Sequence, residues 1–381
     1  MELKDIRIEI DEIDKQMTEL FKRRMDCSRK VAEYKIENSL TVLNTERELA
    51  VLDKVEKNSQ PYGASARLMY STILELSRAL QHDMAGSGAK LKNVIMTAES
   101  VVPFESEKIR VACFGAEGAY SHKAAMTIFP NSLPRFYSPF KEVFSAVQNG
   151  QADFGIIPIE NSSAGSVTAV YDLMLKYRFY IAAAADIPVR HCLAAKKGTK
   201  PEDIRRIYSH EQALLQCSDF LGCRSNIEVK AYISTAQAAK MVSESDETGI
   251  AAICSEDAAK KYGLEVLQRG FQNDPDNCTR FIVISKKLYI TDSADKISLC
   301  FALPHVTGSL YSILCRFAAH GLNLTKIESR PINGRGFEYF FYLDFTGSTS
   351  ESGTRDLLCA LSEEITDFSF LGNYREFTEG E

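Results

Sequence analysis

The sequence predicts a multidomain protein whose successive segments belong to three fold classes: all-α, α/β and α+β. Three observations support this prediction. Apolar residues recur at helical 3/4 spacing through residues 1–85, strands alternate with helices through residues 109–290, and residues 296–375 follow the order β-α-β-β-α-β of a ferredoxin-like domain. Because 381 residues are too many for one hydrophobic core, we expect two or three domains.

The overall composition is that of a soluble globular protein, with 45% hydrophobic and 25% charged residues. A net charge of -6 leaves no basic surface for nucleic acid, and no apolar run is long enough to span a membrane. The charged N-terminus does not resemble a signal peptide, and the ten cysteines are scattered, which predicts free thiols and a cytoplasmic protein. No cluster has metal-ligand spacing, so we expect neither a metal nor an organic cofactor.

Residues 1–85 are expected to form three helices, the first of them about 50 Å long at 1.5 Å per residue. A capping box at Thr45–Glu48 predicts a second helix through Val55, and a third is expected from about Ala64 to Gln81. A helix this long cannot bury its apolar stripe against two shorter ones, so we expect dimerisation through it. The stripe consists of Leu3, Ile6, Ile10, Ile13, Met17, Leu20, Cys27, Val31 and Tyr34.

Polar residues interrupt the apolar faces of these helices. Arg24 takes a position on the seam where a hydrophobic residue is expected, and Lys35 lies only about 20° around the helix from it. Ser77 and Gln81 form an i,i+4 pair on the third helix, and Arg7 lies about 100° from Arg24, where it would serve a partner subunit. The pattern allows two explanations: side chains that snorkel or pair with Glu, or a buried pocket for a dicarboxylate.

These residues resemble the all-helical chorismate mutase domain. The resemblance implies an interlocked dimer in which Arg7 enters the neighbouring site and clamps substrate carboxylates together with Arg24. Lys35 and Gln81 would donate to the ether oxygen as it gains negative charge. Glu48 would hold the ring hydroxyl, so that conformation and electrostatics, without a nucleophile, drive an intramolecular rearrangement. The motif residues are Arg7, Arg24, Lys35, Asn44, Arg47, Glu48, Ser77 and Gln81; Asn44 stands where relatives often have Asp.

Residues 86–108 lack periodicity and are predicted to be a linker. The alternating elements of residues 109–290 predict a mostly parallel sheet in two lobes with a cleft between them. Polar turns follow several of the strands, and no G-x-G-x-x-G fingerprint is present. Each turn alone is weak evidence, because Ser and Asn cap helices routinely, but together they favour a cleft for an anionic ligand. The turns contain Ser121, Asn161, Ser162, Ser209, Gln216 and Thr235.

The stretch "PDNCTRFIVIS" combines two kinds of sequence. Phe281–Ile284 predict a buried strand, whereas Thr279 and Arg280 precede it as either a capping turn or a site. The pattern alone does not separate the two. Together with "GAEGAYSH", "GQADFGIIPIENSSAGSV" and "YSHEQALLQC", however, the stretch resembles prephenate dehydratase.

This second resemblance implies two lobes like those of periplasmic binding proteins, with the substrate between them. Thr279 would be the essential catalytic residue, hydrogen-bonding the leaving hydroxyl while CO2 is lost. Glu160 and His210 are rival acids with more suitable pKa values. The implied substrate contacts come from the polar turns and the strand: Ser121, Asn161, Ser162, Ser209, Gln216, Thr235 and Arg280.

Residues 296–375 contain "GSLYSIL" and "ESRP", which resemble the regulatory ACT domain. The resemblance implies a phenylalanine site between paired ACT domains, with Gly308 allowing close approach of the backbone. Ser309 and Tyr311 depart from the usual pattern. The residues framing the site would be Gly308, Ser309, Leu310, Glu328, Ser329 and Arg330.

The combined expectation is a bifunctional chorismate mutase/prephenate dehydratase in L-phenylalanine synthesis, inhibited by phenylalanine and assembled as a homodimer or homotetramer. Chorismate, prephenate and phenylalanine are the expected small-molecule partners. Two alternatives remain at this point. One is a prephenate or arogenate dehydratase with a weak or vestigial mutase domain, and the other is a non-catalytic amino-acid sensor.

Overall fold

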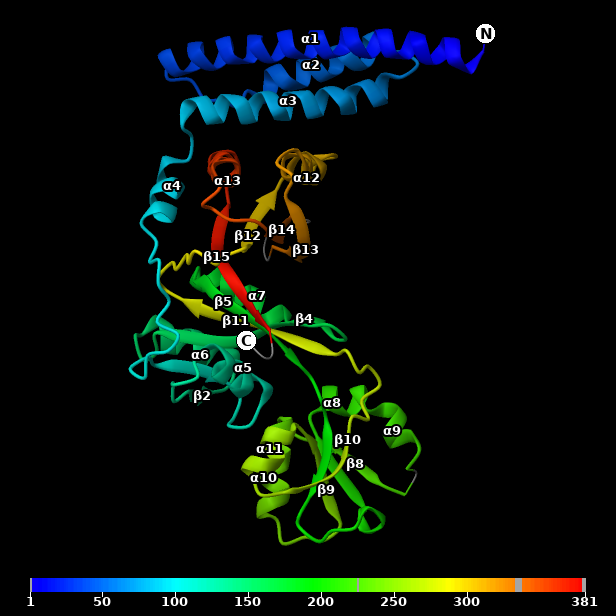
Figure 1. The fold of residues 1–381 in the computed structure, drawn as a ribbon, viewed down its shortest axis with the longest axis vertical. Coiled ribbons are helices and arrows are strands. Elements are labelled where there is room, and N and C mark those ends of the chain that lie inside the picture. The colour runs from blue at the N-terminus through cyan, green and yellow to red at the C-terminus, as the bar shows by residue number, and fades with distance from the viewer. Residues whose placement is uncertain (1, 225, 333–337, 379–381) are drawn as a thin grey trace. The chain divides into compact units, whose positions relative to one another are not determined.

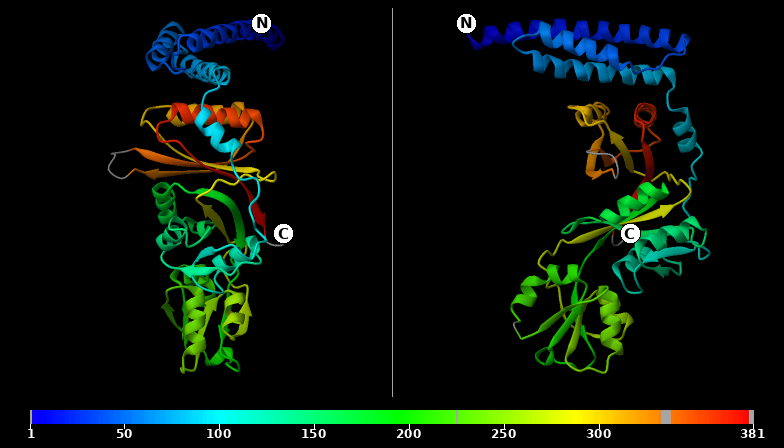
Figure 2. Two further views of the ribbon diagram at one scale, coloured as in Figure 1. Left: turned by 90° about the vertical axis from the view of Figure 1, so that its left-hand side faces the viewer. Right: turned by 180° about the vertical axis from the view of Figure 1, so that it is seen from behind.

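The computed structural model describes residues 2–224, 226–332 and 338–378. The chain forms two compact units, each built from two stretches of sequence (Figures 1 and 2). The first unit contains Met1–Thr97 and Lys296–Phe370, and the second contains Ala98–Asp295 and Leu371–Glu381. The two units are described separately below.

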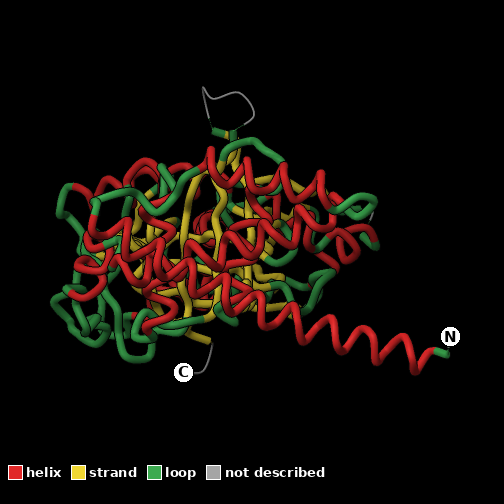
Figure 3. Tube along the Cα trace, turned by 90° about the horizontal axis from the view of Figure 1, so that it is seen from above, coloured by secondary structure: helices red, strands yellow, loops and turns green. Residues whose placement is uncertain are grey.

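The N-terminal part of the first unit is all helix. Helix α3 packs against both α1 and α2. The 35 residues of α1 confirm the predicted length, but only Ser28 and Ala32 of this helix are buried. Its N-terminal half projects past its neighbours (Figure 3), and its apolar stripe stays exposed. The helices are α1 (Leu3–Glu37), α2 (Thr45–Asn58), α3 (Gly63–Ala85) and α4 (Ala89–Met96).

One local prediction in this region is wrong. The N-cap of α2 is Asn44, whose side-chain oxygen accepts from the Arg47 backbone N–H at 2.9 Å, so Thr45 does not head a capping box. The Asn44 side chain caps the helix one residue earlier, and the Glu48 backbone N–H, which a Thr45 cap would have bound, donates to the Asn44 carbonyl at 3.1 Å instead. The predicted linker contains α4, an eight-residue helix with a buried face at Ile95.

The C-terminal part of the first unit confirms the predicted element order. Strand β14 lies antiparallel to both β12 and β13, and helices α12 and α13 both contact α3. The elements are β12 (Lys296–Leu303), α12 (Ser309–Ala319), β13 (Asn323–Pro331), β14 (Tyr339–Thr346), α13 (Ser352–Glu364) and β15 (Ser369–Thr378).

The second unit has two lobes, as predicted. In the first lobe β1 runs parallel to β2 and β3, whereas β11 runs antiparallel to its neighbours β3 and β5. The last part of β15 adds a parallel edge strand to β5. The elements are β1 (Val111–Phe114), α5 (Tyr120–Ile128), β2 (Arg135–Tyr137), α6 (Phe140–Gln148), β3 (Phe154–Asn161), β4 (Gly165–Ser166), α7 (Thr168–Tyr177), β5 (Tyr180–Pro188) and β11 (Cys278–Ser285).

The second lobe has a five-stranded sheet in the order β10-β6-β9-β7-β8. Here β6 is antiparallel to β10 and β9, while β7 is parallel to β9 and β8. The elements are β6 (Cys192–Ala195), a 3₁₀ turn (Pro201–Asp203), β7 (Arg206–Ser209), α8 (Glu211–Gln216), α9 (Ser218–Gly222), β8 (Glu228–Ala231), α10 (Thr235–Glu244), β9 (Ile250–Cys254), α11 (Glu256–Lys261) and β10 (Glu265–Arg269).

The expectation of mostly parallel sheets is therefore wrong, because both sheets are mixed. The chain leaves the first lobe along β5 and returns along β11, and two strands joined in this way run antiparallel. Strand β11 confirms the predicted buried strand: Phe281–Ile284 are at most 3% exposed, between β3 and β5. This buried half holds the preceding Thr279 in register with Asn161 of β3.

Candidate functional sites

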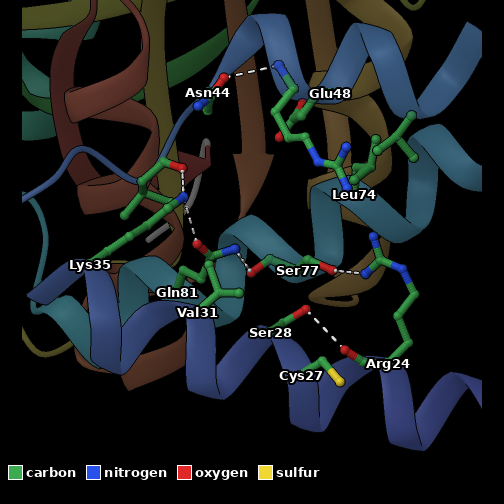
Figure 4. Close-up of a pocket in the computed structure, with 13 residues that line it drawn as sticks. Arg24, Cys27, Ser28, Val31, Lys35, Asn44, Glu48, Leu74, Ser77 and Gln81 are labelled. Carbon is green, nitrogen blue, oxygen red and sulfur yellow. Dashed lines mark hydrogen bonds between the residues drawn. The ribbon is translucent and has the colours of Figure 1, made fainter.

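Helices α1, α2 and α3 of the first unit line a cavity of about 340 Å³ (Figure 4). Its lining brings together the cationic seam of α1, the start of α2 and the polar pair of α3. Every residue of the predicted mutase site lines it except Arg7, which lies on the exposed N-terminal part of α1. The predicted residues in the lining are Arg24, Lys35, Asn44, Arg47, Glu48, Ser77 and Gln81.

Direct hydrogen bonds connect the two faces of this cavity. The Arg24 guanidinium donates to the Ser77 hydroxyl at 2.6 Å, and the Lys35 ammonium donates to the Gln81 side-chain oxygen at 3.0 Å. Lys35 also donates to the Val42 carbonyl, and the Gln81 amide donates to the Ser77 carbonyl at 3.1 Å. The spacing of Arg24 and Lys35 therefore predicted their common face correctly.

Charge in the cavity is shared with a residue that sequence reasoning missed. The Glu48 carboxylate accepts from the guanidinium of Arg78, which lies on α3 next to Ser77. Burial lowers the pKa of Lys35, Glu48 opposes that shift, and Arg78 adds to it. The signal for Arg78 was its position in "ELSRALQ", three residues after Glu75.

A second cavity, of about 410 Å³, lies in the second unit and is lined by both lobes. The first lobe contributes Ser121, Asn161 and Thr279, and the second lobe contributes Gln216 and Thr235. These five are predicted site residues. The rival acid His210 also lines the cavity, and its Nδ1 accepts from the Gln212 backbone N–H at 3.2 Å. Glu160, the other rival, is not part of the lining.

The hydroxyl of Thr279 is oriented by an amide. Asn161 Nδ2 donates to Thr279 Oγ1 at 2.9 Å and to Asn277 Oδ1 at 2.8 Å. Because the Thr279 oxygen accepts from Asn161, its own proton is left for a different acceptor. Asn277 is only 1% exposed and was missed by sequence reasoning, although it stands two residues before Thr279.

Two predicted serines lie outside the cavity lining and bond to other groups instead. Ser209 is fully buried, and its hydroxyl donates to the Ile253 carbonyl at 2.6 Å. The Ser162 hydroxyl accepts from the Cys278 backbone N–H at 2.9 Å. Both therefore support the loops that carry the lining, and the structure does not place either as a direct substrate contact.

Arg280 also lies outside the lining. Its guanidinium pairs with both carboxylate oxygens of Asp186, each at 2.8 Å, and with Glu376 at 3.1 Å. The reason is strand geometry: Thr279 and Phe281 face the cavity, so the residue between them faces the other side of the sheet. These carboxylates raise the pKa of Arg280 above its ordinary value, led by the Asp186 hydrogen bond.

A second missed group supports Gln216. His191 Nε2 lies 3.0 Å from Gln216 Oε1, and Tyr120, whose hydroxyl donates to the Arg190 carbonyl, lies 3.3 Å from His191 Nδ1. Burial lowers the pKa of His191, partly offset by the Gln216 hydrogen bond, and this favours the neutral imidazole. His191 and Tyr120 both line the cavity.

The residues predicted for the amino-acid site lie on two different elements of the C-terminal segment. Gly308 precedes α12 with φ 88°, a conformation that glycine adopts without strain. Ser309 lines a cavity of about 260 Å³ beside Gly308, while Glu328, Ser329 and Arg330 lie on β13, outside that lining. The Tyr311 hydroxyl lies 3.4 Å from Thr72 Oγ1 of α3.

Two family models match this chain, each over a different stretch of residues. Residues 6–82 match the family model of chorismate mutase type II, and residues 111–288 match that of prephenate dehydratase. The chain thus combines a mutase domain with a dehydratase domain. No helix among the described residues is both long and apolar enough to cross a membrane.

The combination of a mutase domain and a dehydratase domain also occurs in a relative of this chain. The bifunctional chorismate mutase/prephenate dehydratase of Aquifex aeolicus (strain VF5) is 32% identical over 379 residues, which cover 98% of each chain. The chain therefore belongs to the bifunctional chorismate mutase/prephenate dehydratase family. An arogenate dehydratase/prephenate dehydratase of Arabidopsis thaliana is 37% identical over 74% of this chain and 73% of its own. A solved structure of prephenate dehydratase from Arthrobacter aurescens, in complex with L-Phe, aligns with a TM-score of 0.64 and 32% sequence identity. The alignment covers 70% of this chain and 90% of that structure's chain.

Proposed function

We propose that the helical cavity is the mutase active site, converting chorismate to prephenate. The convergence of Arg24, Lys35 and Gln81 on one cavity is the observation that carries this proposal. An ammonium has three donors and an amide has two. Lys35 uses two of its donors within the protein and Gln81 uses one, so each keeps a proton for the substrate ether oxygen. As that oxygen gains charge, these fixed donors stabilise the transition state more than the ground state.

The cavity of the second unit is proposed as the dehydratase site. The prephenate carboxyl leaves as CO2, its bonding electrons complete the aromatic ring, and the ring hydroxyl departs with a proton as water. Thr279 would hydrogen-bond that oxygen as charge develops, with its own hydroxyl aimed by Asn161. The product is phenylpyruvate, the precursor of phenylalanine.

The decisive experiment supplies chorismate to the purified full chain and follows both products. Phenylpyruvate formation is expected. Accumulating prephenate would contradict the dehydratase assignment, and no turnover would favour the sensor alternative. Because the Arabidopsis relative is named for both substrates, arogenate should be compared with prephenate by kcat/KM in the same preparation.

The proposal includes a homodimer built on α1. Leu3, Ile13 and Leu20 are 63%, 48% and 58% exposed, an apolar stripe that one chain leaves uncovered. Arg7 would reach the neighbouring cavity across this interface. Sedimentation should give at least a dimer, and Arg7→Ala should lower mutase activity while leaving association intact.

The C-terminal segment is proposed to be an ACT domain that senses phenylalanine. The β-α-β-β-α-β order and the turn at Gly308 support this proposal. Dehydratase activity should fall as phenylalanine is added in the millimolar range. Unchanged activity and unchanged association state across that range would contradict the proposal.

A further inference from the structure

A buried charge cluster connects the C-terminal helices of the first unit to the mutase cavity. It is centred where α12 and α13 meet α3 (Figure 1). The side chains of Arg78, Glu75, Glu364 and Arg316 are at most 9% exposed. Isolated charges at this depth are strongly disfavoured, so each must be held by its partners.

The cluster is continuous from α13 to the cavity. Glu364 of α13 pairs with Arg316 of α12, and its Oε2 lies 3.5 Å from Arg78 Nε. Arg316 Nε lies 2.6 Å from Glu75 Oε2, and Glu75 also pairs with Arg78. The remaining Arg78 nitrogen, Nη1, donates to Glu48 Oε2. One planar guanidinium therefore faces three carboxylates, and a single ammonium has no such fork.

The ionisation of the cluster follows from the same geometry. Burial would raise the pKa of Glu364, but His82, whose Nε2 lies 2.6 Å away, together with Arg316 and Arg78, brings it to about 2. Burial would lower the pKa of Arg78, but Glu75, Glu364 and Glu48 raise it above its ordinary value. Glu364 and Arg78 therefore stay charged at neutral pH.

We propose that Arg78 is a positioning residue for the mutase reaction, which fixes the Glu48 carboxylate in the cavity, and that Glu364 and Arg316 of the C-terminal segment fix Arg78. The mutase site is then completed by residues more than two hundred positions away in sequence. This inference rests on the proposed mutase function. It assigns Arg78 no contact with substrate, because Arg78 does not line the cavity.

The test measures kcat and KM for chorismate in the full chain, with prephenate turnover of the same sample as an internal control. Arg78→Met should lower mutase kcat about 10- to 100-fold, the range expected when a substrate-contacting group is misplaced. KM should change less, because Arg24 remains in place. Arg78→Lys should recover only part of the loss, since one ammonium cannot bridge three carboxylates.

A matched control exists on the same helix. Arg67 of α3 pairs with Asp53 and Glu56 of α2 at 2.7 and 3.0 Å, outside the cavity. Arg67→Met also removes an α2–α3 ion pair, although the Arg67 side chain is 34% exposed against 9% for Arg78, and this variant should leave mutase kcat unchanged. Equal losses in the Arg67 and Arg78 variants would overturn the proposal in favour of general destabilisation.

Glu364→Gln tests the distant end of the cluster with almost no change in size. We expect a several-fold loss of mutase kcat with prephenate turnover unchanged. If Arg78→Met loses both activities through misfolding, the glutamine variant decides, and wild-type mutase kcat in it would overturn the proposal. If the proposed mutase function itself is wrong, the wild-type chain will not turn over chorismate. That result is distinct from a failure of the positioning role of Arg78, in which the wild-type chain is active.

Discussion

The two cavities of this chain differ sharply in charge, although both proposed substrates carry two carboxylates. The helical cavity is lined by Arg24, Lys35, Arg47 and Glu48. Among the described residues that line the proposed dehydratase cavity there is no Lys, Arg, Asp or Glu; its polar groups are hydroxyls, amides and imidazoles.

The chemistry explains this difference. In the rearrangement, both carboxylates survive and the ether oxygen gains charge, so fixed cations stabilise the transition state. In the dehydratase reaction, one carboxylate is destroyed as CO2. A cation paired with that carboxylate would stabilise the ground state and oppose the reaction, because only preferential stabilisation of the transition state accelerates it. Neutral donors avoid that penalty.

The largest effect should come from removing the one hydroxyl assigned to the leaving group. Thr279→Val keeps the shape of the side chain and should lower phenylpyruvate formation from prephenate by about 10²- to 10³-fold, the usual loss for such a donor. Mutase activity should not change. The assignment fails if Thr279→Val stays near wild type while Glu160→Gln or His210→Ala abolishes activity.

A loss of about 10²-fold is expected in the charged cavity for Lys35→Gln, because a neutral amide replaces the ammonium that faces the ether oxygen. Chorismate consumption measures it, and prephenate turnover serves as the control. Wild-type chorismate turnover in this variant would show that the charge difference between the cavities has no catalytic meaning.

A smaller effect is expected in the pH dependence of mutase kcat/KM, because the helical cavity contains a lysine. Lys35 carries a positive charge only when protonated, and burial lowers its pKa below the ordinary 10.5, with Glu48 opposing and Arg78 adding to the shift. Mutase kcat/KM should therefore fall with rising pH at a midpoint below 10.5. Lys35→Gln should remove this alkaline decline. A midpoint at or above 10.5 would contradict the assignment.

The smallest catalytic effect is predicted for Arg280, because it lies on the far face of its strand. Arg280→Met breaks the pairs with Asp186 and Glu376 and should lower the free energy of unfolding by about 2 kcal/mol. Denaturant titration measures this loss. KM for prephenate should stay near wild type. A large rise in KM would instead support Arg280 as a substrate contact.

Much of the proposed mutase site was predictable because the spacing of residues along a helix fixes the direction in which each side chain points. Arg24 and Lys35 lie eleven residues apart on one uninterrupted helix, and no tertiary information is needed to place them on one face. Arg78 was not predictable in the same way. Its partners Arg316 and Glu364 come from another segment, and no local period relates positions so far apart in sequence.

The proposed dehydratase site was predictable only in part for a related reason. Asn161 and Thr279 end adjacent strands, and their meeting follows from the pairing of β3 with β11. Ser209 satisfies the same sequence pattern but turns inward, because the fold supplies the Ile253 carbonyl as its acceptor. Arg280 was misplaced although strand alternation, applied to Thr279 and Phe281, already indicates the opposite face.

Strand β15 has a consequence for how this protein can be divided. Arg375–Thr378 pair with Ala183–Asp186 of β5, and Glu376 contacts Arg280, so the dehydratase unit takes its edge strand from the far end of the chain. A fragment that stops at residue 290 would expose the backbone N–H and C=O groups of β5, which could then pair with a strand of another chain. The dehydratase is in this sense a discontinuous domain. A truncated enzyme, or a gene fusion joined between the apparent modules, has to supply a replacement for that last strand.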